Sequence, residues 1–427
     1  MKHYSKSFYY ALLLAGMILG TAWAIRGQFG HEQGAAWAGA IGSLGILVLA
    51  KKPEWYPKAL KATLAGAIGW GLGGLMSYGM VVGYGRGTDF PNVYYGLAML
   101  LVIGGLYGFV GGGLFGLVLS ESEEKKVAWH TLKVEMVVAA LVAYFFIVEE
   151  WGWLMTPPRS ELWAACLGSA LGLTWFLVRN GHPAALRVAI YAGLGGGFGF
   201  AFGNFLQVLG NVSQIPFNFW NVMEYSLGFF GGAGMAYGTF TADWKPQNSS
   251  KSTDKPFWFV MGALLLFIPL VVWDQSFGAE RVSKILTPLT TMNADTITQL
   301  TQLVAFLSIV GMAYFWFHFF YVQNKSKLLN YNDLKSFLLA HWGLYTFLSL
   351  LITGAFLSTY RIEQYLYLVN IVVVGWFISK VKPDFYPTEL HSRKPWILLA
   401  STLLVLAILA WIATMSHGEV KGAQVRF

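Results

Sequence analysis

Long apolar runs separated by short polar segments recur along the whole chain. The runs contain 16 to 24 residues, the length that an α-helix needs to cross the hydrocarbon core of a bilayer. Strands of an outer-membrane barrel are a poor alternative, because they give short segments of alternating hydrophobicity. The pattern predicts an all-α, polytopic transmembrane helical bundle. We expect thirteen spans, near residues 8–25, 32–50, 59–82, 96–119, 127–148, 161–178, 184–207, 220–240, 257–273, 298–321, 335–356, 364–379 and 396–415.

The first apolar run has two interpretations. It follows Lys2 and Lys6 and ends in the small-x-small sequence Ala22-Trp23-Ala24, features that are also typical of a cleaved signal peptide. The run is long for a signal peptide, and it leads directly into a polar turn and another apolar run. We therefore expect residues 1–24 to remain as the first span. Cleavage is the alternative, and it would leave the orientation of the remaining chain unchanged.

The distribution of positive charge predicts the orientation of the bundle. With the N-terminus in the cytoplasm, the predicted inner segments hold 21 of the 29 lysines and arginines, and the outer segments hold eight. Cytoplasmic loops of membrane proteins carry such an excess. We therefore expect the N-terminus inside and the C-terminus outside, in a bacterial-type inner (cytoplasmic) membrane. The net charge of +8 then reflects topology and not a nucleic-acid partner.

The composition and the absence of known motifs exclude several classes of site. Only 12% of the residues are charged, whereas soluble domains carry about 25%. The one cysteine, Cys166, lies inside an apolar run, which excludes a disulfide framework and a cysteine metal cluster. The sequence contains no phosphate-binding loop of the Walker type, no His-Glu-x-x-His zinc motif and no nucleophile elbow. We expect no cofactor, no metal and no nucleic acid, and whether the chain is an enzyme stays open.

Glycine divides the chain into two parts. Of 49 glycines, 41 lie in residues 1–240. Between Gly104 and Gly116 they recur every fourth residue, which places them on one helix face where two backbones can approach closely. We expect a glycine-rich eight-span unit with a faint parallel four-span repeat over 1–240, a cytoplasmic linker over 241–256, and a five-span unit with a short outer tail over 257–427.

The polar segment from Arg26 to Gly34 joins two apolar runs with almost no loop. Its charges are expected at or just below the outer interface, where ionisable groups are costly and more often serve a function. Arg26 is suited to hold an anion, and His31 beside Glu32 is suited to move a proton. The alternative is a structural latch in which Arg26 pairs with Glu32 across the turn.

Further polar residues are expected on the outer side. Arg86 lies in a glycine-rich segment, Asn204 and Gln207 share a face of one span, and Glu224 lies about one turn into the next. Arginine offers a planar fork that binds carboxylates, phosphates or sulfates through two hydrogen bonds. The predicted substrate-binding residues are therefore Arg26, His31, Glu32, Arg86, Asn204, Gln207 and Glu224.

Three functions remain open from the sequence. The first is a permease for a small polar or anionic solute, in which Arg26 and Arg86 hold the anionic group and Glu32 or Glu224 couples to protons. The second is a membrane-embedded transferase or hydrolase that acts at the outer face on a lipid-linked or glycan substrate, with His31 or Glu32 as general base. The third is a non-catalytic subunit of a membrane assembly. Membrane lipid and the small polar or anionic solute are the expected partners. The sequence leaves open whether the chain forms an oligomer.

Overall fold

The computed structural model describes residues 4–245, 254–324, 328–390 and 393–427. Within these ranges the secondary structure is helical and includes no strand, so the all-α class is confirmed for the described part of the chain. Nine helices in these ranges are long and apolar enough to cross a membrane. The protein is therefore a multi-span helical membrane protein. The other four expected spans correspond to α3, α7, α9 and α15, which are shorter or less apolar.

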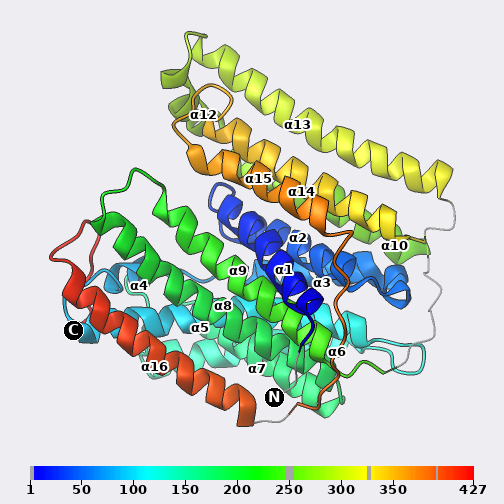
Figure 1. Ribbon diagram of the computed structural model, residues 1–427, viewed down its shortest axis with the longest axis horizontal. Coiled ribbons are helices and arrows are strands. Elements are labelled where there is room, and N and C mark those ends of the chain that lie inside the picture. The colour runs from blue at the N-terminus through cyan, green and yellow to red at the C-terminus, as the bar shows by residue number, and fades with distance from the viewer. Residues whose placement is uncertain (1–3, 246–253, 325–327, 391–392) are drawn as a thin grey trace.

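The first group of helices forms the larger part of the bundle, drawn from blue to green in Figure 1. It consists of α1 (Lys6–Arg26), α2 (Glu32–Ala50), α3 (Ala59–Gly73), α4 (Gly79–Tyr84), α5 (Phe90–Ser120), α6 (Trp129–Tyr144), α7 (Trp163–Arg179), α8 (Pro183–Val212) and α9 (Phe219–Thr241). Short 3-10 and π segments, Pro53–Lys58 and Phe145–Glu150, precede α3 and extend α6.

Glycine lets the central helices of this group approach one another. A Cβ atom on Gly108 of α5 would overlap the carbonyl oxygen of Ala192 on α8, and one on Gly199 of α8 would overlap that of Ser226 on α9. Close backbone contact of this kind is the usual role of small residues between membrane helices. The glycine spacing seen in the sequence thus corresponds to real helix crossings.

The third expected span, residues 59–82, is not one continuous helix. Helix α3 ends at Gly73, a non-helical stretch follows, and only the short α4 continues beyond it. Glycine is a weak helix former, and a Cβ on Gly74 would overlap the backbone of His31 and Glu32. The break therefore lets the chain pass close to the α1–α2 turn, and it carries Tyr78 into the interior.

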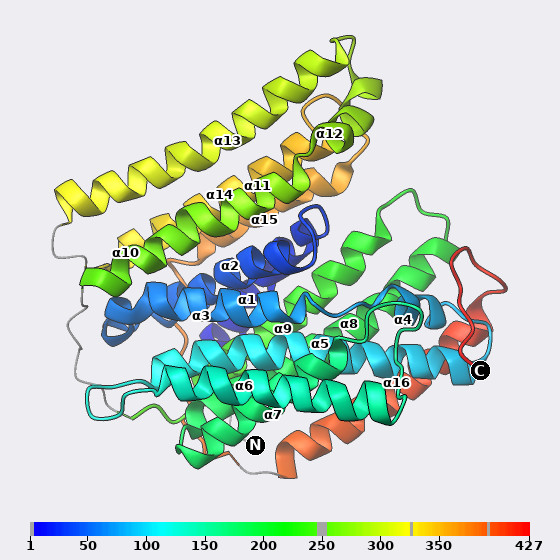
Figure 2. The ribbon, with the colours of Figure 1, turned by 180° about the vertical axis from the view of Figure 1, so that it is seen from behind.

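The second group packs beside α1–α3 as a separate layer (Figures 1 and 2). Its helices are α10 (Asp254–Gly262), α11 (Ile268–Ser276), α12 (Ala279–Leu286), α13 (Ala294–His318), α14 (Tyr331–Thr353) and α15 (Ile362–Phe377), with short segments at Ala263–Phe267, Thr287–Leu289 and Phe319–Gln323. Several hydrogen bonds join the groups. Among them, the Tyr345 hydroxyl donates to the Gly34 carbonyl at 2.9 Å, and Trp37 Nε1 lies 3.2 Å from His341 Nδ1.

The last helix, α16 (Arg393–Ser416), leaves the second group and packs on α5 and α8. The expected five-span unit over 257–427 is thus divided in space, although its helices follow one another in the chain. His341 of α14 is buried and lies against Trp37 of α2.

Several peripheral helices expose large apolar side chains, among them Leu141 of α6, Phe315 of α13 and Trp411 of α16. A helix that is apolar on its exposed face is stable where its surroundings are also apolar. These faces are therefore suited to contact lipid.

The bundle has two ends, which we name by residues that lie there. The Arg86 end carries the α1–α2 turn, residues 85–89 and the α8–α9 loop. The His182 end carries residues 121–128, the α7–α8 loop and residues 242–245.

Candidate functional site

A buried ion pair lies inside the bundle, where α1 meets α9. Arg26, the last residue of α1, donates through Nη2 to a carboxylate oxygen of Glu224. The Tyr78 hydroxyl accepts a hydrogen bond from the same Nη2 at 2.8 Å and donates to the other carboxylate oxygen of Glu224 at 2.9 Å. Arg26 is 1% exposed and Glu224 is 4% exposed. Three distant segments therefore form one closed polar network in the interior.

Local backbone features position this network. Gly30 adopts φ = +87°, a conformation that glycine takes without strain, and it allows the tight turn after Arg26. On the other side of Arg26, a Cβ on Gly20 would lie 3.1 Å from the Tyr225 carbonyl oxygen, so α1 and α9 approach closely. The Gly30 turn and the close approach of α1 to α9 at Gly20 together bring Arg26 within hydrogen-bonding distance of Glu224.

Three aromatic side chains line the network on the interior side. The rings of Trp23 and Trp70 lie 4.9 Å apart, Tyr107 lies 5.0 Å from Trp23, and the Arg26 guanidinium lies 5.2 Å from the Trp23 ring. All are buried. Four polar groups here have no hydrogen-bond partner among the described residues: Nε1 of Trp23 and of Trp70, Nε of Arg26 and the hydroxyl of Tyr107.

These four unpartnered groups can all act as hydrogen-bond donors. Indole and guanidinium N–H groups only donate, and the tyrosine hydroxyl can donate as well. Leaving a buried donor without an acceptor costs about 1–3 kcal/mol. These groups are therefore able to donate hydrogen bonds that no described residue accepts.

A second polar layer lies closer to the Arg86 end. Arg86 Nη2 donates to the Gln207 side-chain oxygen at 2.9 Å, and the Asn204 amide lies 3.5 Å from the same oxygen. The Arg86 guanidinium stacks over the Trp220 ring at 5.0 Å. A Cβ on Gly85 would overlap the Asn204 side chain, so the glycine permits this approach.

The two layers are one helical turn apart. On α9, Trp220 of the second layer precedes Glu224 of the first by four residues. On α8, Phe200 packs against Tyr78, with ring centroids 5.0 Å apart, and precedes Asn204 by four residues. Side chains four positions apart on a helix lie on the same face. The second layer therefore lies about one helical turn from the buried ion pair on both α8 and α9.

Residues 417–427 cover this second layer. Arg86 Nη1 lies 3.4 Å from the Lys421 carbonyl oxygen, and the backbone N–H of Gln424 donates to the Gly83 carbonyl at 3.0 Å. The Phe427 ring packs edge-on against Tyr95. The segment after α16 thus closes the Arg86 end over the polar layer.

The remaining two predicted residues lie nearer the surface. His31 Nδ1 is 3.5 Å from Arg26 Nη1, and the His31 ring lies beside Tyr78. Glu32 is exposed and forms no ion pair with Arg26 in the described structure. The alternative interpretation, a structural latch in which Arg26 pairs with Glu32, is therefore wrong, because Glu224 is the acidic partner of Arg26.

Comparison with known proteins does not assign the chain to a family. No protein-family model matches the chain, and no characterised protein or solved structure is significantly similar to it. Within the ranges that the structure describes, no group of three His, Cys, Asp or Glu side chains is placed to hold a metal ion.

Sequence reasoning missed Tyr78 and the three aromatic residues Trp23, Trp70 and Tyr107. Tyr78 was hidden inside an expected continuous span. Tryptophan and tyrosine in membrane helices usually gather at the two interfaces, so the positions of Trp70 and Tyr107 near the middle of apolar runs were the available signal, whereas Trp23 lies near the end of its run. Only the structure brings them beside Arg26 and Glu224.

Proposed function

We propose that the protein is a permease that moves a small anionic or otherwise acceptor-rich solute. The observation that carries this proposal is the surplus of buried donors beside Arg26, described above. An anion entering this region would accept from Trp23, Trp70 and Tyr107 while Arg26 supplies positive charge. A purely structural ion pair has no need of these extra donors.

The two layers suggest a route for the solute. Arg86, Gln207 and Asn204 would receive it at the Arg86 end, and the buried network would bind it next. Glu224 is the residue suited to exchange a proton, because it is the carboxylate of the buried network and both of its oxygens face hydrogen-bonding partners there. The segment 417–427 would have to move away for entry.

In the orientation that we propose, the Arg86 end faces outward. Thirteen spans then place the N-terminus inside and the C-terminus outside, in a bacterial-type inner membrane, with the basic loops of the His182 end in the cytoplasm. Labelling of single cysteines at the two ends of the protein in intact cells tests this orientation. Reagent reaching a cysteine in residues 121–128 but not one in residues 85–89 would contradict it.

A conservative variant separates solute binding from folding. Tyr107→Phe removes only a hydroxyl that has no partner among the described residues, so a structural role predicts unchanged or slightly higher stability. A binding role predicts weaker solute binding. Tyr345→Phe is the matched control: it removes a hydroxyl that bonds the Gly34 carbonyl, so stability should fall while binding is kept.

The solute is found by screening small anions, such as sulfate, phosphate and short carboxylates, against the purified protein by thermal shift. Those that stabilise it are then tested for uptake into vesicles that carry the protein. Arg26→Lys keeps a positive charge beside Glu224 but loses Nε and the planar fork, so uptake should fall. Arg159→Lys, at an exposed arginine, should not change it. Uptake that is equal in wild type, Tyr107→Phe and Arg26→Lys would contradict the proposal.

An enzyme acting at the outer face is the second candidate. It is favoured by His31, which lies exposed at the surface and 3.5 Å from Arg26, as a general base next to an anion clamp would. Chemical conversion of a lipid-linked or glycan substrate by the purified protein, abolished by His31→Gln, would favour this candidate. A subunit without activity of its own would show neither conversion nor uptake.

A further inference from the structure

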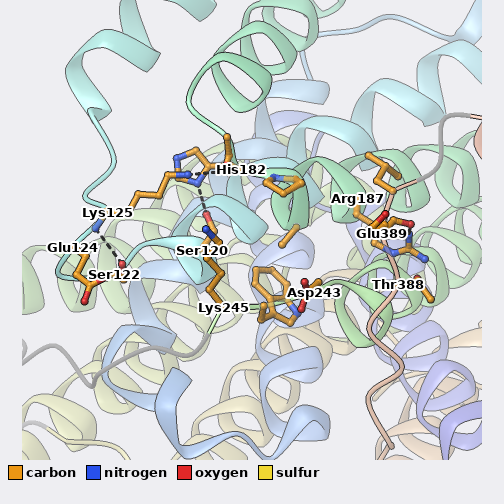
Figure 3. Close-up of a pocket in the computed structure, with 15 residues that line it drawn as sticks. Ser120, Ser122, Glu124, Lys125, His182, Arg187, Asp243, Lys245, Thr388 and Glu389 are labelled. Carbon is orange, nitrogen blue, oxygen red and sulfur yellow. Dashed lines mark hydrogen bonds between the residues drawn. The ribbon is translucent and has the colours of Figure 1, made fainter.

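A second region of interest lies at the end of the molecule opposite the Arg86 end. A cavity of about 690 Å³ opens at the His182 end. Its wall is formed by the end of α5, the α7–α8 loop, the first turn of α8, the residues after α9 and the stretch 388–390 (Figure 3). Pockets of about 300–1,000 Å³ are the usual size for small ligands.

Arg187 forms the floor of this cavity. It lies in the first two turns of α8, is 5% exposed, and donates through Nε to the Thr241 hydroxyl at 2.9 Å. Its Nη1 lies 3.4 Å from the Glu389 carbonyl oxygen, and the guanidinium stacks on the Tyr191 ring. No carboxylate in the described part of the chain pairs with it. A buried arginine is thus held in place by neutral groups, and no counter-ion for its charge lies among the residues that the structure describes.

The start of α8 adds to the positive potential. Pro183 and Ala184 line the cavity, and among the described residues no side chain caps this end of the 30-residue helix. The N-terminus of a helix carries a partial positive charge and unpaired N–H groups, which together attract anions. Beside it, His182 lies 2.9 Å from the Ser120 hydroxyl. Figure 3 shows Arg187 beside Thr388 and Glu389, with His182 and Ser120 nearer Lys125.

The other charges of the cavity lie at its rim. Glu124, Asp243 and Glu389 are exposed, as is Lys245, and Lys125 is half-buried. Water and salt screen exposed charges much more than buried ones. The field at the floor is therefore dominated by Arg187 and the start of α8, and an anion is the ligand that this field favours.

We propose that this cavity binds a phosphate group, with Arg187 as its principal ligand. The guanidinium fork matches phosphate oxygens, the helix N-terminus offers further N–H donors, and Ser120 and Thr388 also line the cavity. The volume leaves room for an esterified phosphate. Basic pockets between helices at the cytoplasmic side of membrane proteins bind lipid head groups in this way, and a free phosphorylated solute would use the same contacts.

The test measures thermal unfolding of the full chain, purified in neutral detergent and stripped of lipid. Inorganic phosphate is titrated at constant ionic strength, and the protein is also placed in phosphatidylcholine vesicles with and without phosphatidylglycerol. Stabilisation by inorganic phosphate indicates a free anion, and stabilisation by phosphatidylglycerol alone indicates a lipid head group. Either result supports the proposal if it depends on Arg187. Absence of both in the wild type overturns it.

Variants make the test specific. Arg187→Gln should weaken the response about tenfold, the loss expected for one charge-assisted contact, and Arg187→Lys should keep part of it. Arg179→Gln is the matched control, since Arg179 lies at the same end but outside the cavity and pairs with Glu135. Arg26→Lys should also leave it unchanged, which separates this site from the proposed transport site.

A gain-of-binding variant covers the case in which Arg187→Gln does not fold. Asp243→Asn removes an exposed carboxylate from the cavity wall, so phosphate should bind more tightly, with a smaller change than Arg187→Gln produces because the exposed charge is screened. If binding is the same in Asp243→Asn as in the wild type, and Arg187→Lys also leaves it unchanged, the cavity is not the site and the proposal fails.

Discussion

Arg26 and Glu224 are 198 positions apart in the chain, yet each is the main charged partner of the other. In the membrane interior neither side chain can turn to water, so their pairing is coupled to the packing of α1 on α9. Tyr78 bonds both and fixes their orientation. At the residue scale, the network is therefore both a structural requirement and the centre of the proposed site.

The first prediction concerns this coupling. Removing one partner leaves an uncompensated buried charge, so Arg26→Ala or Glu224→Ala should each lower the free energy of unfolding by about 3–5 kcal/mol. The double variant should cost clearly less than the sum of the two, because it leaves no unpaired charge. Chemical unfolding in detergent measures all three. Additive losses would mean that the two side chains do not interact.

The second prediction concerns His182, which lies between α7 and α8. Burial, helped by the nearby Lys125 cation, lowers the pKa of His182 from 6.5 to about 4. The unfolded chain therefore binds a proton between these pH values that the folded chain does not, and stability should fall as the pH drops from 6.5 towards 4. His182→Gln should reduce this loss in pH-dependent thermal unfolding. His130→Gln, at an exposed histidine, should leave it unchanged.

At the scale of whole elements, the α5–α8 contact depends on glycine. Gly108 meets the backbone of Ala192, whereas Gly311, in the middle of the peripheral helix α13, has open space where a Cβ would be. The same residue type thus has opposite roles in two helices.

The third prediction follows from this difference. Gly108→Ala forces the helices apart and should cost about 1–3 kcal/mol, as overpacking does. Gly311→Ala should be neutral or stabilise by up to about 1 kcal/mol, because alanine favours the helix. Thermal unfolding of the two variants compares them directly. Equal effects would show that the α5–α8 crossing is looser than described.

At the scale of the whole molecule, the last helix and the segment after it connect distant parts. Helix α16 lies against α5 and α8, and residues 417–427 then reach across the Arg86 end to the α4–α5 region. This arrangement places a peripheral segment over the polar layer of Arg86, Asn204 and Gln207.

The fourth prediction tests whether that cover controls access. A side chain on Gly83 would overlap Gln424, so Gly83→Val should displace the segment, whereas Gly79→Val has open space and is the control. Displacement should expose Arg86 and speed the uptake of whichever solute the screen identifies. Limited proteolysis should also cut within residues 417–427 faster in Gly83→Val. No change in either measurement would mean that the segment is not a cover.

The periodicity of apolar residues was sufficient to predict the helical class and the approximate position of most helices, because an apolar run of membrane length has few other stable structures. It failed at α3, where the run looked continuous but the backbone breaks after Gly73. Hydrophobicity alone does not record that Gly74 must pass the backbone of His31 and Glu32.

The sequence by itself determined that the protein is a helical membrane protein and that polar residues such as Arg26 and Glu224 are exceptional, since composition and burial cost are local properties. Only the tertiary structure decided which of them meet. The pairing of Arg26 with Glu224 instead of Glu32, the entry of Tyr78, and the return of α16 to α5 all depend on contacts between helices far apart in the chain. Such contacts are set by which faces pack together, and the order of residues along one helix does not specify that.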